Sequence, residues 1–462
     1  MNAREAAAKT VIEIIDKRVP FHIAIAAMIQ KNPDWNAHER GFAKRLTDGT
    51  VRHLIAIDYL LGSFSKTPVN KLKPWVRSVL RISVFQLMFC EDVPHSAACN
   101  EAVKLTKKYG FVNLSGFVNG VLRSIGREGK EQLEKGMKAS VDEAIRLNYS
   151  IPLWLIKQWV RDYGAETAEK IAAATGRECE LTIRCNLSRV TKEQLLASLE
   201  KEGVQAIPAT YAENAFHLYG CDGIEKLESF QNGWFQIQDE SSILVGQCSD
   251  IKGGEQVLDL CAAPGGKSLH IADLLAVQSA GNKQKGHLEA RDVSEQKLEL
   301  IRDHLEKNKW GNVTLVCADA TVFDPEKEES ADLVVADVPC SGTGVIARKP
   351  DIKYNMTEES QNELICLQHR ILQNAVRYVK PGGALLFSTC TLNKDENDSG
   401  RTFLLERGMQ AESISPYLPE TLRSEDTDNG FLRLIPGIHS TDGFYISRYR
   451  KKQTTTVVES VF

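Results

Sequence analysis

The feature that most constrains the fold is a regular alternation of short apolar runs and helix-like segments that begins near Glu255. The runs have the length of β-strands and occupy Val257–Cys261, His287–Asp292, Val313–Asp319, Leu333–Asp337 and Ala384–Thr389. Strands that alternate with helices favour a parallel sheet covered on both faces. The sequence therefore predicts a Rossmann-like α/β domain over residues 236–450, which ends in a hairpin of Phe431–Ile435 and Phe444–Tyr449.

The first 130 residues follow a different pattern. Their apolar positions recur at three-and-four spacing, and prolines or glycines separate the segments, which predicts a compact all-α bundle. This part holds 20 Lys+Arg against 11 Asp+Glu, a net charge of +9. Because the whole chain carries −4, the remainder carries −13. A basic module joined to an acidic one is typical of an RNA-binding arm on an enzyme.

Between these two parts lies a stretch with mixed character, residues 141–235. It begins with helical segments, and from Glu180 it changes to a strand, a helix and a second strand at Leu181–Cys185, Lys192–Lys201 and Ala215–Tyr219. We expect linker helices followed by a small α/β insert.

The cysteines of the chain bear on its location and on metal binding. Eleven cysteines are scattered over 462 residues without a C-x-x-C pair or a Cys/His cluster of zinc spacing. This usage is not that of a secreted disulfide framework, and it makes a metal site unexpected. No apolar run has the length needed to span a bilayer, so we expect a cytoplasmic protein.

A glycine-rich turn identifies a candidate cofactor site. The segment Asp259–Lys267 (DLCAAPGGK) follows an expected strand and opens an expected helix. Ligands of open parallel sheets bind at such turns, where glycine lets the backbone approach closely. An ATP-binding loop needs a glycine five residues before Gly266, where Cys261 stands. The predicted cofactor loop consists of Cys261, Ala262, Ala263, Pro264, Gly265, Gly266 and Lys267.

Three acids stand at the ends of successive expected strands, namely Asp292, Asp319 and Asp337. An acid after the second strand usually accepts hydrogen bonds from ribose hydroxyls, and Asp319 is placed to accept from an adenine amino group. The full G-x-G-x-x-G spacing of dinucleotide-binding proteins is missing. The pattern therefore favours S-adenosylmethionine over NAD, with all three acids as cofactor-binding candidates.

Two cysteines follow expected strands, Cys340 in Asp337–Gly344 (DVPCSGTG) and Cys390 after Ser388-Thr389. Cytosine C5 is a poor nucleophile until a thiolate adds to C6 and pushes electron density onto C5. A protonated Asp337 could hydrogen-bond N3 and absorb the charge that develops there. Enzymes that methylate exocyclic amines show Asp/Asn-Pro-Pro-aromatic at this place. Cysteine in the fourth position favours cytosine C5, and both cysteines remain candidates for the nucleophile.

These motifs resemble those of the Sun/Fmu family of RNA 5-methylcytosine methyltransferases, specifically its bacterial 16S rRNA branch. The resemblance spans most of residues 236–450 and rests on the motifs above together with Arg348–Lys353 (RKPDIK) and Asp442–Tyr445 (DGFY). Ala318, where family members often have glycine, and Asp398, where they often have glutamate, depart from the pattern without removing a required chemical group.

The N-terminal part is similar to the NusB-type RNA-binding domain, notably at Pro94–Val103 and Gly116–Arg123. The middle stretch, with Arg184–Asn186 and Gln238–Ser241, fits the small RNA-binding subdomain of the family.

The resemblance implies a role for each catalytic candidate. Cys390 would be the nucleophile, Cys340 would assist release of the product, and Asp337 would contact the base. The substrate would be 16S rRNA, naked or partly assembled, bound by a monomeric enzyme. Two alternatives stay open, a tRNA substrate and a non-catalytic RNA-binding or antitermination factor that keeps the fold.

Overall fold

The computed structural model describes residues 1–221, 223–279 and 285–453. The chain folds into two compact units. Unit 1 comprises Met1–Arg177 and Val345–Thr357, and unit 2 comprises Glu178–Gly344 and the chain from Glu358 onward. No described helix is both long and apolar enough to cross a membrane.

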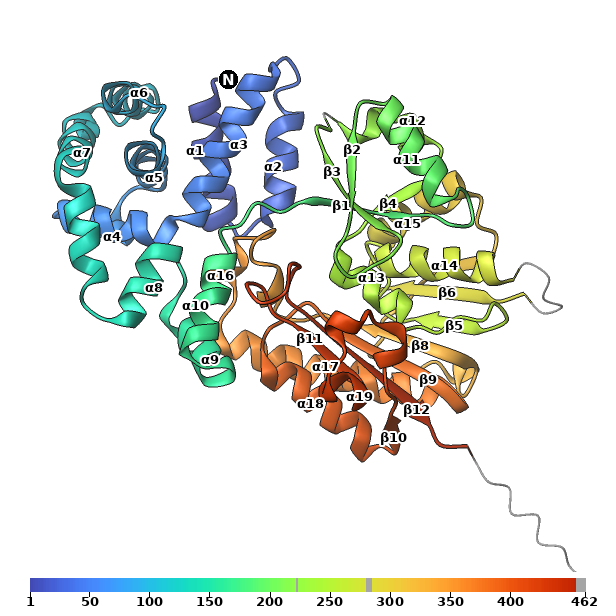
Figure 1. The fold of residues 1–462 in the computed structure, drawn as a ribbon. Coiled ribbons are helices and arrows are strands. Elements are labelled where there is room, and N and C mark those ends of the chain that lie inside the picture. Colours follow the sequence, from blue (N-terminus) through green and yellow to red (C-terminus); the bar gives the residue numbers. More distant parts are fainter. Residues whose placement is uncertain (222, 280–284, 454–462) are drawn as a thin grey trace, which may run out of the picture. The chain divides into compact units, whose positions relative to one another are not determined.

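Unit 1 is all-helical, as the spacing of apolar residues predicts (Figure 1). Sequence signals set several helix starts: the Asn36 side chain and Glu39 form a reciprocal capping box before α3, and Pro74 occupies the first position of α5. The helices are α1 (Ala3–Ile15), α2 (Phe21–Gln30), α3 (Ala37–Arg52), α4 (Leu54–Phe64), α5 (Pro74–Phe89), α6 (His95–Lys108), α7 (Ser115–Met137), α8 (Val141–Tyr149), α9 (Leu153–Tyr163), α10 (Ala165–Ala174) and α16 (Ile352–Asn355).

The segment Val345–Thr357, which holds the RKPDIK motif and α16, belongs to unit 1 although the sequence around it belongs to unit 2. The Lys353 ammonium donates to the carbonyl oxygen of Arg52 at 2.9 Å, and the Tyr354 hydroxyl donates to that of Val51 at 2.7 Å. The Arg52 guanidinium in turn donates to the carbonyl oxygen of Ala347 at 2.7 Å. These bonds fix the segment against the C-terminal end of α3.

Unit 2 contains two sheets. The smaller is antiparallel with strand order β2-β3-β1-β4, and it forms the α/β insert expected after Glu180. Leu195 and Leu199 of its helix pack with Ile183 and Phe216 of the sheet in one apolar cluster. The elements are β1 (Leu181–Cys185), α11 (Lys192–Lys201), β2 (Gln205–Pro208), β3 (Ala215–Tyr219), α12 (Glu228–Gln231) and β4 (Phe235–Ile237).

The larger sheet has the order β10-β12-β9-β8-β5-β6-β7, with β11 paired to β12. Strands β5 to β9 are parallel, and β12 is antiparallel to its neighbours. The expected hairpin is confirmed by the antiparallel β11–β12 pair. The elements are α13 (Glu240–Gln247), β5 (Gln256–Asp259), α14 (Gly266–Gln278), β6 (His287–Asp292), α15 (Glu295–Asn308), β7 (Val313–Cys317), β8 (Ala331–Asp337), α17 (Glu358–Tyr378), β9 (Val379–Thr389), α18 (Lys394–Glu406), β10 (Met409–Ala411), α19 (Glu425–Asp428), β11 (Phe431–Leu434) and β12 (Phe444–Lys451).

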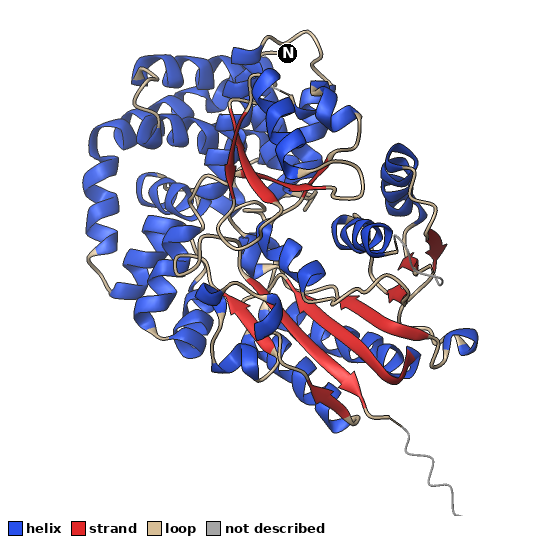
Figure 2. Ribbon diagram, turned by 45° about the vertical axis from the view of Figure 1, so that its right-hand side comes forward, coloured by secondary structure: helices blue, strands red, loops and turns tan. Residues whose placement is uncertain are grey.

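Successive residues of the central strands enter two different cores, because side chains alternate between the faces of a strand. On β8, Leu333 and Val335 belong to one apolar cluster, and Val334 and Ala336 belong to the other. The first cluster includes apolar residues of α14 and α15, and the second includes those of α17 and α18. Helices therefore cover both faces of the sheet, as Figure 2 shows, which confirms the predicted Rossmann-like α/β class.

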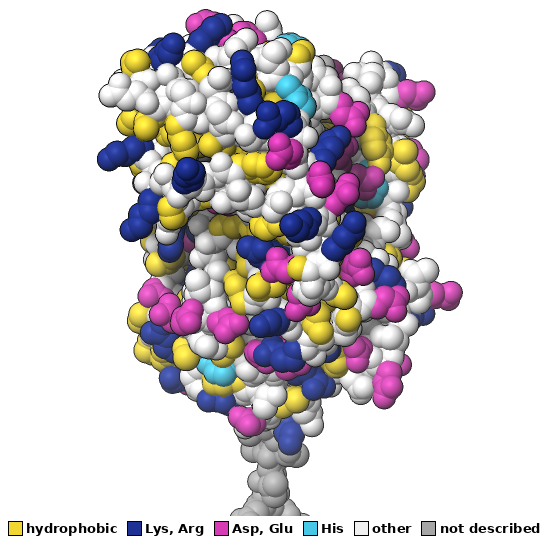
Figure 3. Space-filling view, turned by 90° about the vertical axis from the view of Figure 1, so that its left-hand side faces the viewer, with side chains coloured by type: hydrophobic (Ala, Val, Ile, Leu, Met, Phe, Trp, Pro, Cys, Tyr) yellow, Lys and Arg dark blue, Asp and Glu magenta, His cyan; other side chains and the backbone are white. Residues whose placement is uncertain are grey.

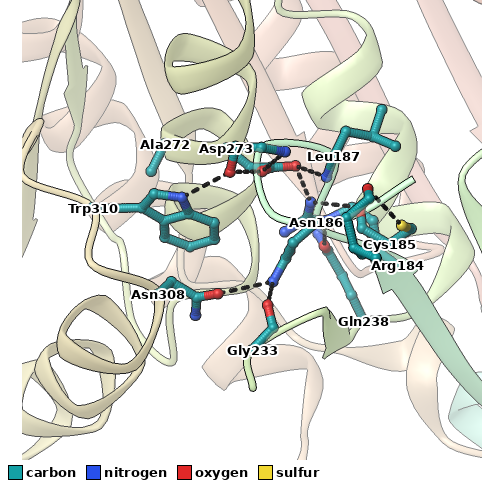
Figure 4. Close-up of polar contacts among 12 residues, drawn as sticks. Arg184, Cys185, Asn186, Leu187, Gly233, Gln238, Ala272, Asp273, Asn308 and Trp310 are labelled. Carbon is teal, nitrogen blue, oxygen red and sulfur yellow. Dashed lines mark hydrogen bonds and ion pairs between the residues drawn. The ribbon is translucent and has the colours of Figure 1, made fainter. Parts of the chain in front are cut away.

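A buried polar network joins the small sheet to the larger one (Figure 4). Arg184 of β1 donates from Nη1 to Asp273 of α14 at 3.1 Å and from Nε to the Gln238 side-chain oxygen at 3.0 Å. Asn186 donates to the Asn308 side chain at 3.2 Å. The Arg184 and Asp273 side chains are 1% and 2% exposed. The network fixes the position of β1 relative to α14 within unit 2.

Candidate active site

The predicted site residues meet at the carboxyl edge of the parallel strands. The strand order reverses between β5 and β8, since β6 and β7 continue on one side and β9 on the other. Asp337, the last residue of β8, is paired in register with Ser388 of β9. Ligands of open α/β sheets bind outside such a reversal point. The topology therefore places the glycine-rich turn and the cysteine loops at the same edge of the sheet.

Asp259, the last residue of β5, holds the glycine-rich turn through hydrogen bonds. Its carboxylate accepts from the Ser268 hydroxyl at 2.5 Å and from the Cys261 amide at 3.3 Å. Complete burial raises the pKa of Asp259 to about 6. Gly265 adopts φ of 109°, a left-handed conformation that favours glycine, and α14 begins at the next residue. Helix α14 thus begins directly after the turn, and no side chain caps its first N–H groups in the described structure.

Two of the three predicted acids continue the same edge. Asp292 is buried at the end of β6, and its carboxylate accepts from the Ala263 amide at 3.2 Å and the Ser294 amide at 3.0 Å. Asp319 lies beyond β7, is exposed, and has a lowered pKa because the Thr321 amide and hydroxyl donate to it. Asp292 is therefore fixed against the cofactor loop, whereas Asp319 presents a carboxylate to solvent.

Gln238 is a further residue beside the cofactor loop. Its side chain lies 3.7 Å from the position that a Cβ on Gly266 would take, and its Nε2 is buried with no hydrogen-bond partner among the described residues. A buried orphan donor beside uncapped helix N–H groups fits a ligand carboxylate, such as that of S-adenosylmethionine. Sequence reasoning assigned Gln238 to the RNA-binding subdomain, and no local pattern indicates that its amide faces Gly266.

The two candidate cysteines lie together. The Sγ atoms of Cys340 and Cys390 are 3.4 Å apart, although 50 residues separate them in the sequence. Both residues are partly buried. The hydrogen bond with Cys390, burial, and the nearby carboxylates of Glu396 and Asp337 raise the pKa of Cys340 well above its ordinary value. These effects favour the protonated form of the Cys340 thiol.

Asp337 is paired with the last residue of the cofactor loop. The Lys267 ammonium donates to one carboxylate oxygen at 2.6 Å, and the Ser388 hydroxyl donates to the other at 2.7 Å. Lys267 also lies 5.0 Å above the ring centroid of Phe444 in the DGFY motif. Both oxygens of the Asp337 carboxyl group therefore accept hydrogen bonds, one of them from a cation. The sequence suggested a protonated Asp337, and it gave no sign that Lys267 pairs with this residue.

Backbone contacts hold the cysteine loops against the DGFY segment. The Gly344 amide donates to the Cys390 carbonyl at 3.0 Å, and the Gly443 amide donates to the Gly344 carbonyl at 2.9 Å. A Cβ on Gly344 would lie 2.1 Å from the Gly443 oxygen. Glycine at these positions therefore permits the close approach of three segments that are distant in sequence.

Comparisons with known proteins decide the family. A family model described as 16S rRNA methyltransferase RsmB/F matches residues 247–450, a NusB family model matches residues 1–127, and a model of the RsmF/B-like ferredoxin-like domain matches residues 151–222. A probable ribosomal RNA small subunit methyltransferase B of Bacillus subtilis is 35% identical over 98% of this chain and 99% of its own length. The chain belongs to the RsmB/F family of 16S rRNA methyltransferases.

Other relatives of this RsmB/F enzyme agree along its whole length. A probable ribosomal RNA small subunit methyltransferase B of Synechocystis is 31% identical over 93% of the chain and 95% of that protein. The crystal structure of PH0851 superposes with a TM-score of 0.80 at 25% identity and covers 98% of this chain and 99% of that one. The RsmB/F resemblance, the NusB-like N-terminus and S-adenosylmethionine as cofactor are thereby confirmed.

The described residues contain no group of three or more His, Cys, Asp or Glu that could hold a metal ion.

Proposed function

We propose that this RsmB/F enzyme methylates C5 of a cytosine in 16S rRNA through a covalent bond between Cys390 and C6 of the base. The observation that carries the proposal is the pair of sulfurs 3.4 Å apart, beside an Asp337–Lys267 ion pair and the glycine-rich turn. Methylation of C5 needs a thiolate that adds to C6 and polar groups that balance the charge on the base, and the site holds two thiols and a carboxylate–ammonium pair. A methyltransferase for exocyclic amines needs no cysteine.

The two cysteines have different roles in the reaction. The Cys390 thiolate adds to C6, and the electron pair of the C5=C6 bond moves onto C5, which then bonds to the incoming methyl carbon. Bound S-adenosylmethionine supplies that methyl group from its sulfonium centre. Water then takes the C5 proton, the electron pair of the C5–H bond re-forms the C5=C6 bond, and the C6–S bond breaks so that Cys390 leaves as a thiolate. Cys340, whose sulfur lies 3.4 Å from that of Cys390, assists this release. The choice of Cys390 as the nucleophile rests on the family resemblance at Ser388–Cys390. The hydrogen bond with Cys390, burial and the nearby carboxylates raise the pKa of Cys340, which favours the neutral thiol there.

The Asp337–Lys267 pair stabilises the base as it reacts. In the resting site Asp337 is paired with an ammonium, so the pair, rather than a carboxyl that is protonated alone, would supply the proton and positive charge required near N3. The Asp337 carboxylate can accept from the exocyclic amine of cytosine, which distinguishes cytosine from uracil. Asp292 and Asp319 would hold the ribose and the adenine of the cofactor, and the loop Cys261–Lys267 its methionine part.

The three parts of the chain would share the work on RNA. We propose that residues 1–130 contact phosphates, residues 141–235 contribute to RNA binding, and residues 236–450 carry out the transfer, in a monomer acting in the cytoplasm on naked or partly assembled 16S rRNA. The names of the relatives and the +9 charge of residues 1–130 support this division. On the face of the molecule drawn in Figure 3, Lys and Arg are dispersed among acidic and neutral side chains.

The test combines labelled S-adenosylmethionine with unmodified 16S rRNA and, separately, with unmodified tRNA. We expect 5-methylcytosine at one position of the rRNA and none in tRNA. Cys390→Ala should abolish methylation, whereas Cys340→Ala should accumulate a protein–RNA adduct that survives denaturing electrophoresis. Cys366→Ala, which removes an exposed thiol from α17, serves as the matched control and should behave like the unmodified protein.

Three results would contradict the proposal. Methylation at any atom other than cytosine C5 would exclude the C6 adduct. Preference for tRNA would reassign the substrate, and an adduct in Cys390→Ala but not in Cys340→Ala would exchange the roles of the cysteines.

A further inference from the structure

We propose that Glu396 is a positioning residue that clamps the Cys340 and Cys390 loops together and so sets the distance between the two sulfurs. The inference rests on the proposed function in one respect: that function is the reason why the distance between the two sulfurs matters. The clamp itself follows from hydrogen bonds that join three elements of unit 2.

On the first loop, Glu396 binds the residue next to Cys340. The Ser341 amide donates to Glu396 Oε2 at 3.0 Å, and the Ser341 hydroxyl donates to Oε1. The backbone at Cys340 is thus held by a carboxylate on α18, an element that begins only after the second cysteine. The bidentate contact adds an anchor directly beside Cys340 to the backbone contacts that Gly344 makes further along the loop.

On the second loop, Glu396 binds the residue next to Cys390. The Thr391 hydroxyl donates to Glu396 Oε1 at 3.1 Å and lies 2.6 Å from the Ser341 hydroxyl. It also lies 3.0 Å from the hydroxyl of Thr343. Ser341 and Thr391 each directly follow a candidate cysteine, so one carboxylate holds the two neighbours of the reactive pair.

Helix α17 completes the arrangement. The Gln368 amide donates to Glu396 Oε2 at 2.9 Å and to the Pro339 carbonyl at 3.0 Å. The same side chain therefore contacts the residue that precedes Cys340. Pro339 and Ser341 flank the first sulfur, and both are tied to the Glu396 network.

The burial of Glu396 argues that this arrangement has a purpose beyond stability. Its side chain is 0% exposed, and its donors are neutral amide and hydroxyl groups rather than a cation. A buried carboxylate with no cationic partner among the described residues is a costly way to hold two loops, and apolar packing would do so at lower cost. Hydrogen bonds, unlike apolar contacts, specify direction, and a sulfur displaced by about 1 Å can lower a rate about 100-fold.

The carboxylate has a second effect on the pair. Its negative charge is one of the causes that raise the pKa of Cys340. The same residue that fixes the spacing therefore also favours the neutral form of the thiol beside it.

The distance between the sulfurs can be measured without RNA or S-adenosylmethionine. Diamide, an azo oxidant, removes one hydrogen from each of two thiols, joins the sulfurs as a disulfide and is itself reduced to the hydrazine. Thiols held 3.4 Å apart should close rapidly, and peptide mass spectrometry identifies the Cys340–Cys390 link among the other cysteines. The closure rate thus reports how well the two loops are held together.

Glu396→Gln tests the clamp, because it keeps the side-chain shape and turns one acceptor oxygen into a donor that faces donors. We expect closure to slow about 10-fold or more and kcat to fall by a similar factor, with KM for S-adenosylmethionine nearly unchanged. Glu412→Gln is the control, since Glu412 is another carboxylate of unit 2 with several hydrogen bonds. It is partly exposed, its donors are Arg448 and Arg450, and its substitution should leave closure unchanged. Ser341→Ala removes a single bridging hydroxyl and provides the same measurement if Glu396→Gln does not fold.

Unchanged closure in both Glu396→Gln and Ser341→Ala would overturn the clamp, and so would a fall in kcat without slower closure. Slower closure in an enzyme that methylates no cytosine would leave the clamp standing and refute the proposed function instead.

Discussion

Asp273→Asn should cause a large local loss of stability, because Asp273 is the buried partner of Arg184. The Asp273 carboxylate accepts from Arg184 Nη1, from the amides of Leu187 and Ser188, and from the Ser188 hydroxyl. The substitution would leave the Arg184 guanidinium, whose Nη2 already has no partner in the described structure, as an uncompensated buried charge. Removing one partner of a buried ion pair costs about 3–5 kcal/mol.

That cost should appear as local opening of the small sheet. Since about 1.4 kcal/mol corresponds to a factor of ten, the opening equilibrium should increase roughly 100- to 4000-fold. Amide hydrogen exchange measures it at Cys185 and Asn186, whose N–H groups bond to the carbonyls of Asn214 and Trp234. Trp310, whose indole N–H donates to Ser188, offers a fluorescence readout of the same event.

A companion substitution distinguishes the charge effect from lost packing. Arg184→Met removes the cation but leaves Asp273 with three donors, so it should accelerate exchange at Cys185 less than Asp273→Asn does. Arg448→Met, which removes another buried guanidinium far along the chain, should leave that exchange within about twofold. An increase below tenfold for Asp273→Asn, or equal effects of the two substitutions, would refute the reasoning.

The remaining predictions concern three other parts of the molecule. Gly344→Ala should reduce methylation and adduct formation at least about 100-fold, because its Cβ would overlap the Gly443 carbonyl. Gly311→Ala is the control and should not reduce them, since no atom lies within 4 Å of the added Cβ. Wild-type kinetics in Gly344→Ala would contradict this prediction. Burial lowers the pKa of Lys353 from 10.5 to about 7, so the unfolded state binds more protons between these values and unit 1 should gain stability as pH rises from about 7 to 10. Urea unfolding of Lys353→Met should lack that gain, and an equal gain would exclude Lys353 as its source. Replacing the exposed Lys107 of α6 and Arg123 of α7 by Glu should weaken RNA binding. The slope of the logarithm of the RNA-binding constant against the logarithm of the salt concentration should fall in magnitude by roughly 1 to 2, while S-adenosylmethionine affinity stays constant. An unchanged slope would show that neither residue contacts RNA phosphates.

The sequence alone determined the features that local chemistry controls. Alternating apolar runs are sufficient to indicate a parallel sheet, because such strands bury both faces. The turn Asp259–Lys267 indicates a ligand loop, because glycine is required where backbone approaches a ligand. Asp292, Asp337 and both cysteines could be assigned to one edge, since the carboxyl ends of parallel strands lie on the same side of a sheet.

Only the tertiary structure decided which side chains meet at that edge. The pairing of Lys267 with Asp337, the contact of Gln238 with Gly266, the clamp at Glu396 and the inclusion of Val345–Thr357 in unit 1 join residues up to some 300 positions apart. Periodicity and motif spacing specify the face or the end of an element, but strand order and side-chain packing determine its neighbours. Two thiols 50 residues apart become neighbours because β8 and β9 are adjacent in the sheet, and strand adjacency is a property of the whole fold.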